Sequence, residues 1–374
     1  MDHTVKMKHP MKSLALPITA LAALCLSSAR AAQAPPLVSP ELLPDGGVTF
    51  RLKAPKASEV KVAGQFGPDA QMSKDTQGVW SATVPSVPAG IHEYRFEVDG
   101  LSVIDPLNSA VKPQRWPGVS ILHVPASPPA PWDRQDIPPG VIHEHAYQSK
   151  ALGKWRRIFV YTPPGVESMG RLPVLYLAHG YSDNEATWTV HGKAHWIMDC
   201  LIASKKARPM IIVMPDAHAL PPGATGFEAY GPANSDALCR ELLQDIIPLV
   251  ERRYKVSAKP RARAFAGLSM GGHHALTVAL NHHDKFGWIG AFSSAPPPTN
   301  SVAAGLNNAP AVNRDLKLFW IACGKNDFLH QRNGTFTALL KEKGIRFEYV
   351  ETEGDHSWPV WRRYLTDFAP KLFR

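Results

Sequence analysis

The segment Ala262-Arg263-Ala264-Phe265-Ala266-Gly267-Leu268-Ser269-Met270-Gly271-Gly272 joins a short apolar run to a helical pattern. The run Ala262–Ala266 predicts a buried strand, and residues 271–281 predict a helix. Between them lies the motif Gly-x-Ser-x-Gly, which holds a serine at the tip of a sharp strand-to-helix turn. Glycine at positions 267 and 271 lets neighbouring backbone approach closely. We therefore predict that Ser269 is a nucleophile, with an ordinary serine in a tight turn as the alternative.

Around this motif, short apolar runs alternate with longer helical patterns from residue 140 to residue 374. Two strands come first, at 141–148 and 154–162, and are expected to pair antiparallel. The alternation that follows predicts a mostly parallel sheet with helices on both faces. The later strands are expected at 172–178, 210–214, 262–266, 288–292, 316–322 and 347–350, and the helices near 194–206, 235–252, 271–281, 330–343 and 359–369.

A serine hydroxyl is a weak nucleophile until a base removes its proton, and we predict that His356 is this base. It follows the last expected strand, whereas His330, the nearest alternative, begins a helix. In α/β-hydrolase folds the acid lies between the serine and the histidine in the chain. Asp327 follows the strand expected at 316–322 and would fix the imidazole tautomer. A helix N-cap is the alternative role for Asp327, and Asp355 directly precedes the histidine, which places its side chain poorly for binding the ring.

The tetrahedral intermediate of acyl transfer needs backbone N–H donors directed at its oxyanion. We predict that Met270, directly after the nucleophile, supplies one donor of this oxyanion hole. Tyr181, in the loop after the strand expected at 172–178, is predicted to supply the other. Trp188 and Trp358 are candidates for substrate contact in an aromatic acyl pocket, although tryptophans near helices more often belong to the core.

Residues 35–124 differ from the rest of the chain because alternating apolar and polar residues replace the helical patterns. Gly and Pro separate these short runs, as in a β-sandwich. Val98-Asp99-Gly100-Leu101 contains the Asp-Gly pair of a two-residue hairpin. The Pro-rich residues 125–139 predict a stiff linker. We therefore expect two domains, an all-β immunoglobulin-like (Ig-like) sandwich over 35–124 and an α/β domain over 140–374.

The first 34 residues have the features of a secretory signal peptide. Lysines precede the apolar stretch 14–26, which is too short to span a membrane, and Ala29-Arg30-Ala31 offers a cleavage pattern. We expect a secreted or periplasmic protein that has no membrane contact after cleavage. The net charge is +9, but Lys and Arg form no run, which argues against nucleic-acid binding. Cys200, Cys239 and Cys323 would remain, either as thiols or with the first two bridged.

Four motifs resemble those of the esterase D-type α/β-hydrolases, which include bacterial feruloyl and acetylxylan esterases and the enterochelin esterases. This resemblance implies the triad Ser269, Asp327 and His356, and it implies that no metal or organic cofactor is needed. The chain departs from the secreted feruloyl esterases at 181–183, where Tyr-Ser-Asp replaces a glycine pair. The motifs are Leu177-Ala178-His179-Gly180, Ala266-Gly267-Leu268-Ser269-Met270-Gly271-Gly272, Ile321-Ala322-Cys323-Gly324-x-x-Asp327 and Gly354-Asp355-His356-Ser357-Trp358.

Residues 35–124 resemble the Ig-like early-set modules that often precede such esterases. Trp80, Tyr94 and Trp116 are expected in the core of this sandwich, with glycan contact as the alternative. The whole pattern predicts a secreted serine carboxylic-ester hydrolase that forms an acyl-enzyme with a carbohydrate-linked ester, a feruloyl or acetyl xylan. An enterochelin-type siderophore esterase, a non-catalytic glycan-binding protein and an acyltransferase are the alternatives.

Overall fold

The computed structural model describes Met1, residues 36–221 and residues 223–374. Val38–Arg374 form one compact unit. The predicted signal peptide at 1–34 lies outside the described residues, apart from Met1. Within the described ranges, every helix is too short or too polar to cross a bilayer. Of the two alternatives for the cysteines of the later chain, the thiols are found: Cys200, Cys239 and Cys323 are free, with Cys239 and Cys323 buried and Cys200 partly buried.

The N-terminal part is built from two antiparallel sheets that share one apolar core. In one sheet the strand order is β1-β2-β6-β5, and in the other it is β4-β3-β7-β8, with β9 also paired to β7. The hairpin predicted at Val98–Leu101 is confirmed, because Asp99 and Gly100 have φ values of 47° and 84° and the flanking residues pair. The strands are β1 Glu41–Leu42, β2 Val48–Lys53, β3 Val60–Gly64, β4 Ala70–Gln71, β5 Ser73–Lys74, β6 Val79–Val84, β7 Gly90–Val98, β8 Leu101–Val103 and β9 Ser120–Val124.

Two of the three aromatic residues expected in this core are there. Trp80 and Tyr94 are 6% and 1% exposed. The expectation for Trp116 was wrong, since its side chain is 62% exposed. The physical reason is that Trp116 lies between β8 and β9, in an irregular segment outside both sheets, where no period-2 pattern turns it toward the core.

The rest of the chain folds around an eight-stranded sheet of order β10-β11-β13-β12-β14-β15-β16-β17. The first two strands and β13 pair antiparallel, and all later pairs are parallel, as the sequence predicts. The strands are β10 Val141–Ser149, β11 Lys154–Thr162, β12 Val174–Ala178, β13 Ile211–Pro215, β14 Arg263–Leu268, β15 Trp288–Phe292, β16 Leu318–Gly324 and β17 Glu348–Thr352.

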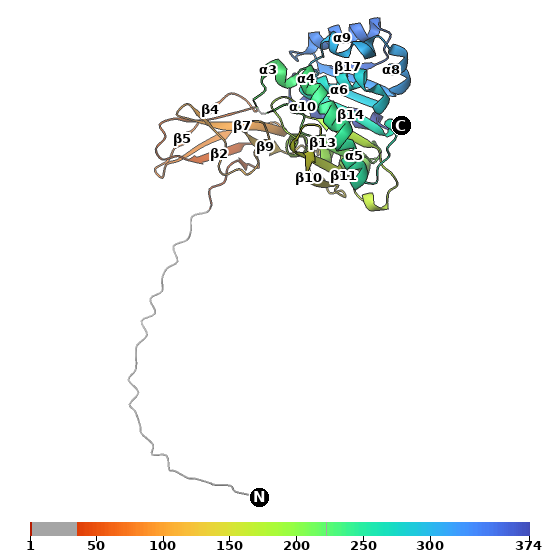
Figure 1. Cartoon of the computed structure of the whole chain (residues 1–374). Helices are drawn as coiled ribbons and strands as arrows, with labels where there is room; N and C mark the ends of the chain where they lie inside the picture. The colour runs from red at the N-terminus through yellow and green to blue at the C-terminus, as the bar shows by residue number, and fades with distance from the viewer. Residues whose placement is uncertain (2–35, 222) are drawn as a thin grey trace, which may run out of the picture. The chain divides into compact units, whose positions relative to one another are not determined.

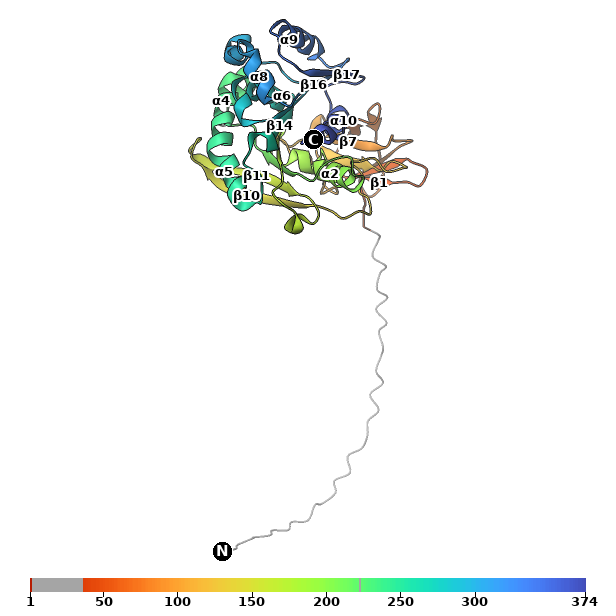
Figure 2. The same ribbon diagram turned by 90° about the vertical axis from the view of Figure 1, so that its right-hand side faces the viewer.

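Helices cover both faces of this sheet (Figures 1 and 2). The core on one face includes residues of α4 to α9, and the core on the other face includes residues of α2 and α10. The helix predicted near 235–252 is α4 and α5, joined by a π-helical turn at Leu242–Ile246. The helices are α1 Thr187–Val190, α2 Ala194–Ala203, α3 Gly226–Tyr230, α4 Pro232–Glu241, α5 Ile247–Arg253, α6 Met270–Asn281, α7 Ala303–Leu306, α8 Ala309–Asp315, α9 His330–Glu342 and α10 Trp358–Phe368.

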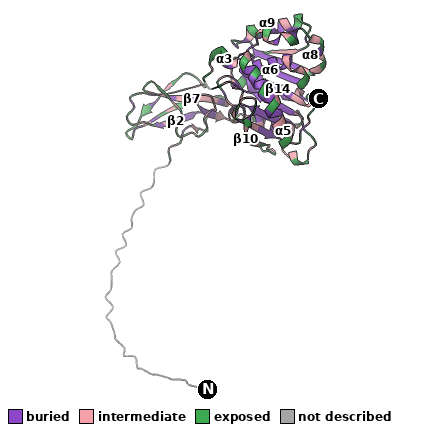
Figure 3. Ribbon diagram, viewed as in Figure 1, coloured by how far each residue is buried: buried purple, intermediate pink, exposed green. Residues whose placement is uncertain are grey.

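The middle of the sheet is buried from both sides (Figure 3). Every residue of β12, β13 and β15 is buried, and so is all of β14 except Arg263. Short, continuously apolar runs are what a parallel sheet with two covered faces requires. Because parallel strands end at one edge, the loops after β12, β14, β16 and β17 gather there, and that edge is where open α/β sheets place their sites.

Candidate active site

Ser269 occupies the sharp turn between β14 and α6 in a strained conformation. Its φ is 53° and its ψ is −109°, a region that residues with a side chain rarely enter. The glycines around it are required by contact. A Cβ at Gly267 would lie 2.5 Å from the Gly271 backbone, and a Cβ at Gly271 would lie 2.6 Å from the Ala178 carbonyl oxygen. The tight turn that the motif predicts is therefore present, with the serine at its tip.

Three side chains far apart in the sequence meet at this turn. His356, in the loop after β17, has its Nε2 3.0 Å from Ser269 Oγ and its Nδ1 2.8 Å from Asp327 Oδ2. Asp327, in the loop after β16, also accepts the Leu329 backbone N–H at 2.8 Å. Burial opposes ionisation of this carboxyl, but the hydrogen bond and charge of His356 prevail and lower the pKa of Asp327. The geometry is that of a charge-stabilised serine–histidine pair.

His330 and Asp355, the alternatives for the base and the acid, form hydrogen bonds with other groups. His330 Nε2 is 2.6 Å from Glu351 Oε2 on β17. The Asp355 carboxylate accepts the hydroxyl hydrogen of Ser357.

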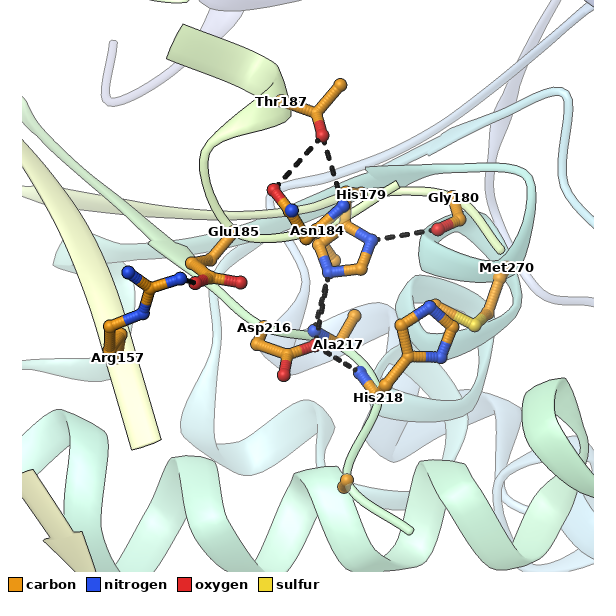
Figure 4. A network of polar contacts seen from close by, with 12 residues as sticks. Arg157, His179, Gly180, Asn184, Glu185, Thr187, Asp216, Ala217, His218 and Met270 are labelled. Carbon is orange, nitrogen blue, oxygen red and sulfur yellow. Dashed lines mark hydrogen bonds and ion pairs between the residues drawn. The ribbon is translucent and has the colours of Figure 1, made fainter. Parts of the chain in front are cut away.

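The loop after β12 is held by the buried imidazole of His179 (Figure 4). The Ala217 backbone N–H donates to His179 Nε2 at 2.9 Å, so the ring hydrogen is on Nδ1, which donates to the Gly180 carbonyl at 2.8 Å. In a trans peptide the N–H points opposite to the C=O of the same unit. The Tyr181 N–H is therefore directed away from the His179 ring.

The second predicted donor, the Met270 N–H, belongs to the first residue of α6. No carbonyl within a helix accepts the N–H of a first residue, so it is available to a ligand, and the positive end of the helix adds to its attraction for negative charge. Gly180 fits the same turn closely, since a Cβ there would lie 2.7 Å from Leu268 Cδ1 and 3.6 Å from Ser269 Cβ.

A pocket of about 360 Å³, which we call the serine pocket, opens beside Ser269. Aromatic rings form part of its wall. The Phe328 and Trp361 rings lie 4.4 Å and 5.0 Å from the His356 ring, measured between centroids. Trp358 also lines the pocket, although it is only 3% exposed. Trp188 lies behind Trp358 at 4.9 Å, 1% exposed, with its Nε1–H donated to the Ala178 carbonyl.

The N-terminal part of the chain contributes to the same pocket. Gln65, Glu93 and Lys112 line it together with Ser269 and His356. Lys112 Nζ lies 2.8 Å from Glu93 Oε1 and 3.6 Å from Asp183 Oδ1, and these three side chains are between 2% and 16% exposed. Burial raises the pKa of Asp183, even though Lys112 opposes this shift.

The segment that contains Lys112 also binds the loop after β12 through its backbone. The Arg115 N–H donates to the Ser182 carbonyl at 2.9 Å, and Thr187 Oγ1 donates to the Pro113 carbonyl at 2.6 Å. Gln114 and Asp183 form an isolated antiparallel bridge. Residues 112–116 therefore brace the loop that contains Tyr181.

The sequence did not single out five of these residues: Gln65, Glu93, Lys112, Phe328 and Trp361. Phe328 and Trp361 had a signal in the chain, because one directly follows Asp327 and the other is one helical turn after Trp358. Gln65, Glu93 and Lys112 had none, since their place in the pocket depends on how the N-terminal part packs against the rest of the chain.

Comparison with known families gives the same picture as the geometry. The family model "Putative esterase" matches residues 149–372. The chain belongs to this esterase family. A second model, carbohydrate-binding module 48 (isoamylase N-terminal domain), matches residues 38–113. The esterase match covers strands β11 to β17, the turn at Ser269 and both loops that carry Asp327 and His356.

One relative is similar to this chain over most of its length. An endo-1,4-beta-xylanase/feruloyl esterase of Xylanibacter ruminicola is 32% identical over 341 residues, which are 88% of this chain and 45% of that protein. The chain thus spans less than half the length of this relative. A ferulic acid esterase structure is 27% identical with a TM-score of 0.53, covering 62% of this chain and 97% of that chain.

An enterobactin esterase structure from Shigella flexneri has the same fold over a longer stretch. Its TM-score is 0.61 at 21% identity, and it covers 87% of this chain and 92% of that chain. The α/β-hydrolase fold predicted from the sequence is thereby confirmed, and an N-terminal β module precedes it as expected.

Proposed function

We propose that this esterase-family chain is a serine carboxylic-ester hydrolase that works through an acyl-enzyme. Ser269 Oγ attacks the acyl carbonyl while His356 Nε2 accepts its proton. The imidazolium then gives this proton to the departing alcohol oxygen. Water attacks the acyl-enzyme with His356 again as the base, and the carboxylic acid leaves. The continuous hydrogen-bond chain from Ser269 through His356 to Asp327, at 3.0 Å and 2.8 Å, supports this proposal.

Charge that develops on the carbonyl oxygen would be stabilised by the N–H groups of Tyr181 and Met270. Two kinds of observation support these roles. The peptide of Tyr181 is oriented by His179 through the Gly180 carbonyl, and Met270 begins a helix. Donors fixed before the reaction cost no reorganisation when the charge forms.

The substrates proposed for this site are plant cell-wall carbohydrate esters, of the feruloyl or acetyl xylan type. The aromatic side chains Phe328, Trp358 and Trp361 of the serine pocket would pack against an aromatic acyl group such as a feruloyl. The relative from Xylanibacter ruminicola, which carries xylanase and feruloyl esterase in its name, also supports this class. Trp188 would act by supporting Trp358. Export, with removal of residues 1–34, is part of the same proposal.

The proposal is tested with p-nitrophenyl acetate and butyrate. We expect turnover by the wild type, loss of turnover in Ser269→Ala, and no change in Ser58→Ala, which removes an exposed hydroxyl. Full turnover by Ser269→Ala would refute the acyl-enzyme. A rapid burst of p-nitrophenol, equal to the enzyme concentration, would report the acyl-enzyme directly.

The siderophore esterase is the second candidate, because the enterobactin esterase fold spans both parts of this chain. Methyl ferulate, acetylated xylan and a tri-catecholate lactone, assayed side by side, separate the two. Cleavage of the lactone alone would favour the siderophore esterase. Absence of any hydrolysis, with binding to xylan retained, would favour the glycan-binding protein, and transfer of the acyl group to an added sugar would favour the acyltransferase.

A further inference from the structure

A second cleft, of about 440 Å³, borders the loop that also lines the serine pocket. Asn184 belongs to this cleft, while Tyr181, Ser182 and Asp183 belong to the serine pocket. We call it the Trp116 cleft. An ester has two parts that diverge from the reacting carbonyl, so a pocket for the acyl group accommodates only one of them. The Trp116 cleft lies next to the reacting site along this loop, as a subsite for the other part would.

Trp116 presents an exposed aromatic surface at this cleft. Its side chain is 62% exposed, and the ring is nevertheless held in place, because the Arg115 guanidinium lies 4.6 Å from its centroid. The same guanidinium lies 5.2 Å from the Tyr181 ring, and the rings of Trp116 and Tyr181 are 6.4 Å apart. A row of stacked groups therefore leads from the serine pocket to the cleft. A fixed, exposed indole is a surface on which the C–H face of a sugar ring can pack.

The cleft also offers hydrogen-bonding groups for hydroxyls. Lys154 and Asp216 line it, and the Lys154 ammonium uses one of its three hydrogens on the Leu220 carbonyl. Burial lowers the pKa of His218 to about 3, so its imidazole is neutral and can donate or accept. Arg115 Nη1 and His218 Nε2 are buried nitrogens for which the described residues supply no partner. Buried polar atoms of this kind are normally satisfied, by protein, water or ligand.

We infer that the Trp116 cleft binds a neutral sugar ring of the glycan that forms the alcohol part of the substrate, with Trp116 as the stacking platform. This inference rests on the proposed function, because it requires an ester of a carbohydrate at Ser269. Trp116 lies just beyond residues 38–113, where the carbohydrate-binding module matches. The cleft therefore sets the preference for the alcohol, and the serine pocket sets the preference for the acyl group.

The test compares a large and a small substrate in the same variant. We divide kcat/KM for feruloylated xylo-oligosaccharide by kcat/KM for methyl ferulate. This ratio should fall about tenfold or more in Trp116→Ala, as for a hot-spot tryptophan. Trp116→Tyr should restore part of the ratio, because it keeps an aromatic face. Trp155→Ala is the matched control, since Trp155 is 72% exposed on β11 and lies outside the cleft, and it should leave the ratio unchanged.

A binding measurement separates recognition from folding and catalysis. Ser269→Ala should bind the intact feruloylated oligosaccharide in calorimetry, and adding Trp116→Ala should weaken this binding by about tenfold or more. An unchanged ratio in Trp116→Ala, or an equal loss on both substrates, would overturn the inference. A wild type that hydrolyses no small ester would instead overturn the proposed function, so the two failures are distinguishable.

Discussion

Lys112→Met tests whether the N-terminal part of the chain holds the loop after β12 in place. The ammonium of Lys112 lies between two carboxylates, at 2.8 Å from Glu93 and 3.6 Å from Asp183, and its side chain is 6% exposed. Methionine fills a similar volume but removes the charge. Both carboxylates then remain buried without their cation, and Asp183 is part of the loop that carries Tyr181.

The size of the effect follows from the burial of all three groups. Removing one partner of a buried ion pair costs about 3–5 kcal/mol, because the other charge stays out of water. Complete loss of one oxyanion donor lowers kcat by about 10²- to 10³-fold. Since the backbone bonds of Arg115 to Ser182 persist in the variant, we expect a smaller decrease, about tenfold to 100-fold in kcat.

The loss of stability should depend on pH in a definite direction. Burial would raise the pKa of Glu93, but its contacts with His191 and Lys112 lower it to about 2 from 4.5. A carboxyl whose pKa is lower in the folded protein stabilises the fold at pH values above its pKa in the unfolded chain. For Glu93 this stabilisation is lost as the pH falls from about 4.5 toward 2. In Lys112→Met the Glu93 pKa rises, so the melting temperatures of wild type and variant should converge as the pH is lowered toward 3.

The assay is p-nitrophenyl acetate hydrolysis together with thermal melts from pH 3 to pH 8. Lys150→Met, at an exposed lysine, is the control and should change neither kcat nor the melting temperature appreciably. Combining Lys112→Met with Glu93→Gln should recover part of the stability, because it removes one of the unpaired charges. A Lys112→Met variant with wild-type kcat, or a stability difference that grows as the pH falls, would refute the reasoning.

Four further predictions concern single positions. Asp327→Asn should lower kcat on p-nitrophenyl acetate by about 10⁴-fold, because the amide favours the wrong imidazole tautomer; a small decrease would show that another group orients the ring. Phe328→Ala should raise KM for methyl ferulate more than KM for p-nitrophenyl acetate, since Phe328 is 74% exposed and borders the serine pocket. An equal rise in both KM values would contradict its contact with the acyl group. Gly271→Ala should yield little folded protein in a thermal melt, because its Cβ would lie 2.6 Å from the Ala178 carbonyl oxygen. Gly334→Ala, in α9 with no atom within 4 Å of the added Cβ, should instead stabilise the fold by about 1 kcal/mol, measured by denaturant unfolding.

The sequence predicts well what is determined by local pattern. The strand-to-helix turn at Ser269 follows from glycines whose added Cβ atoms would collide with backbone. The meeting of Ser269, Asp327 and His356 follows from the parallel sheet, because the loops after its strands lie at one edge. Even so, β14 begins and ends later than the apolar run Ala262–Ala266, because Gly267 and Leu268 continue the pairing with β15 before the turn.

What the sequence could not predict depends on contacts between distant segments. Lys112 has the same local pattern as any lysine in an irregular segment, and only its packing against Asp183, 71 residues later, takes it out of solvent. For Trp116 the opposite happened: its local pattern predicted burial, because a tryptophan near strands is usually in the core, but the side chain is exposed. The short helices α1, α3, α7 and α8 were missed, since helices of four to seven residues show too few turns for an apolar period to appear.

The five residues 112–116 connect the two parts of the chain in function as well as in space. At one end, Lys112 reaches the serine pocket, and at the other, Trp116 forms the exposed wall of the adjacent cleft. Between them the backbone pairs with residues 182–184 of the loop after β12. A fragment that begins at residue 140 would keep Ser269, Asp327 and His356 but would leave Asp183 without its cation and Tyr181 without the guanidinium that stacks on its ring. The hydrolase fold alone therefore carries Ser269, Asp327 and His356, whereas the bracing of the loop after β12 and the inferred preference for a sugar alcohol require residues 112–116.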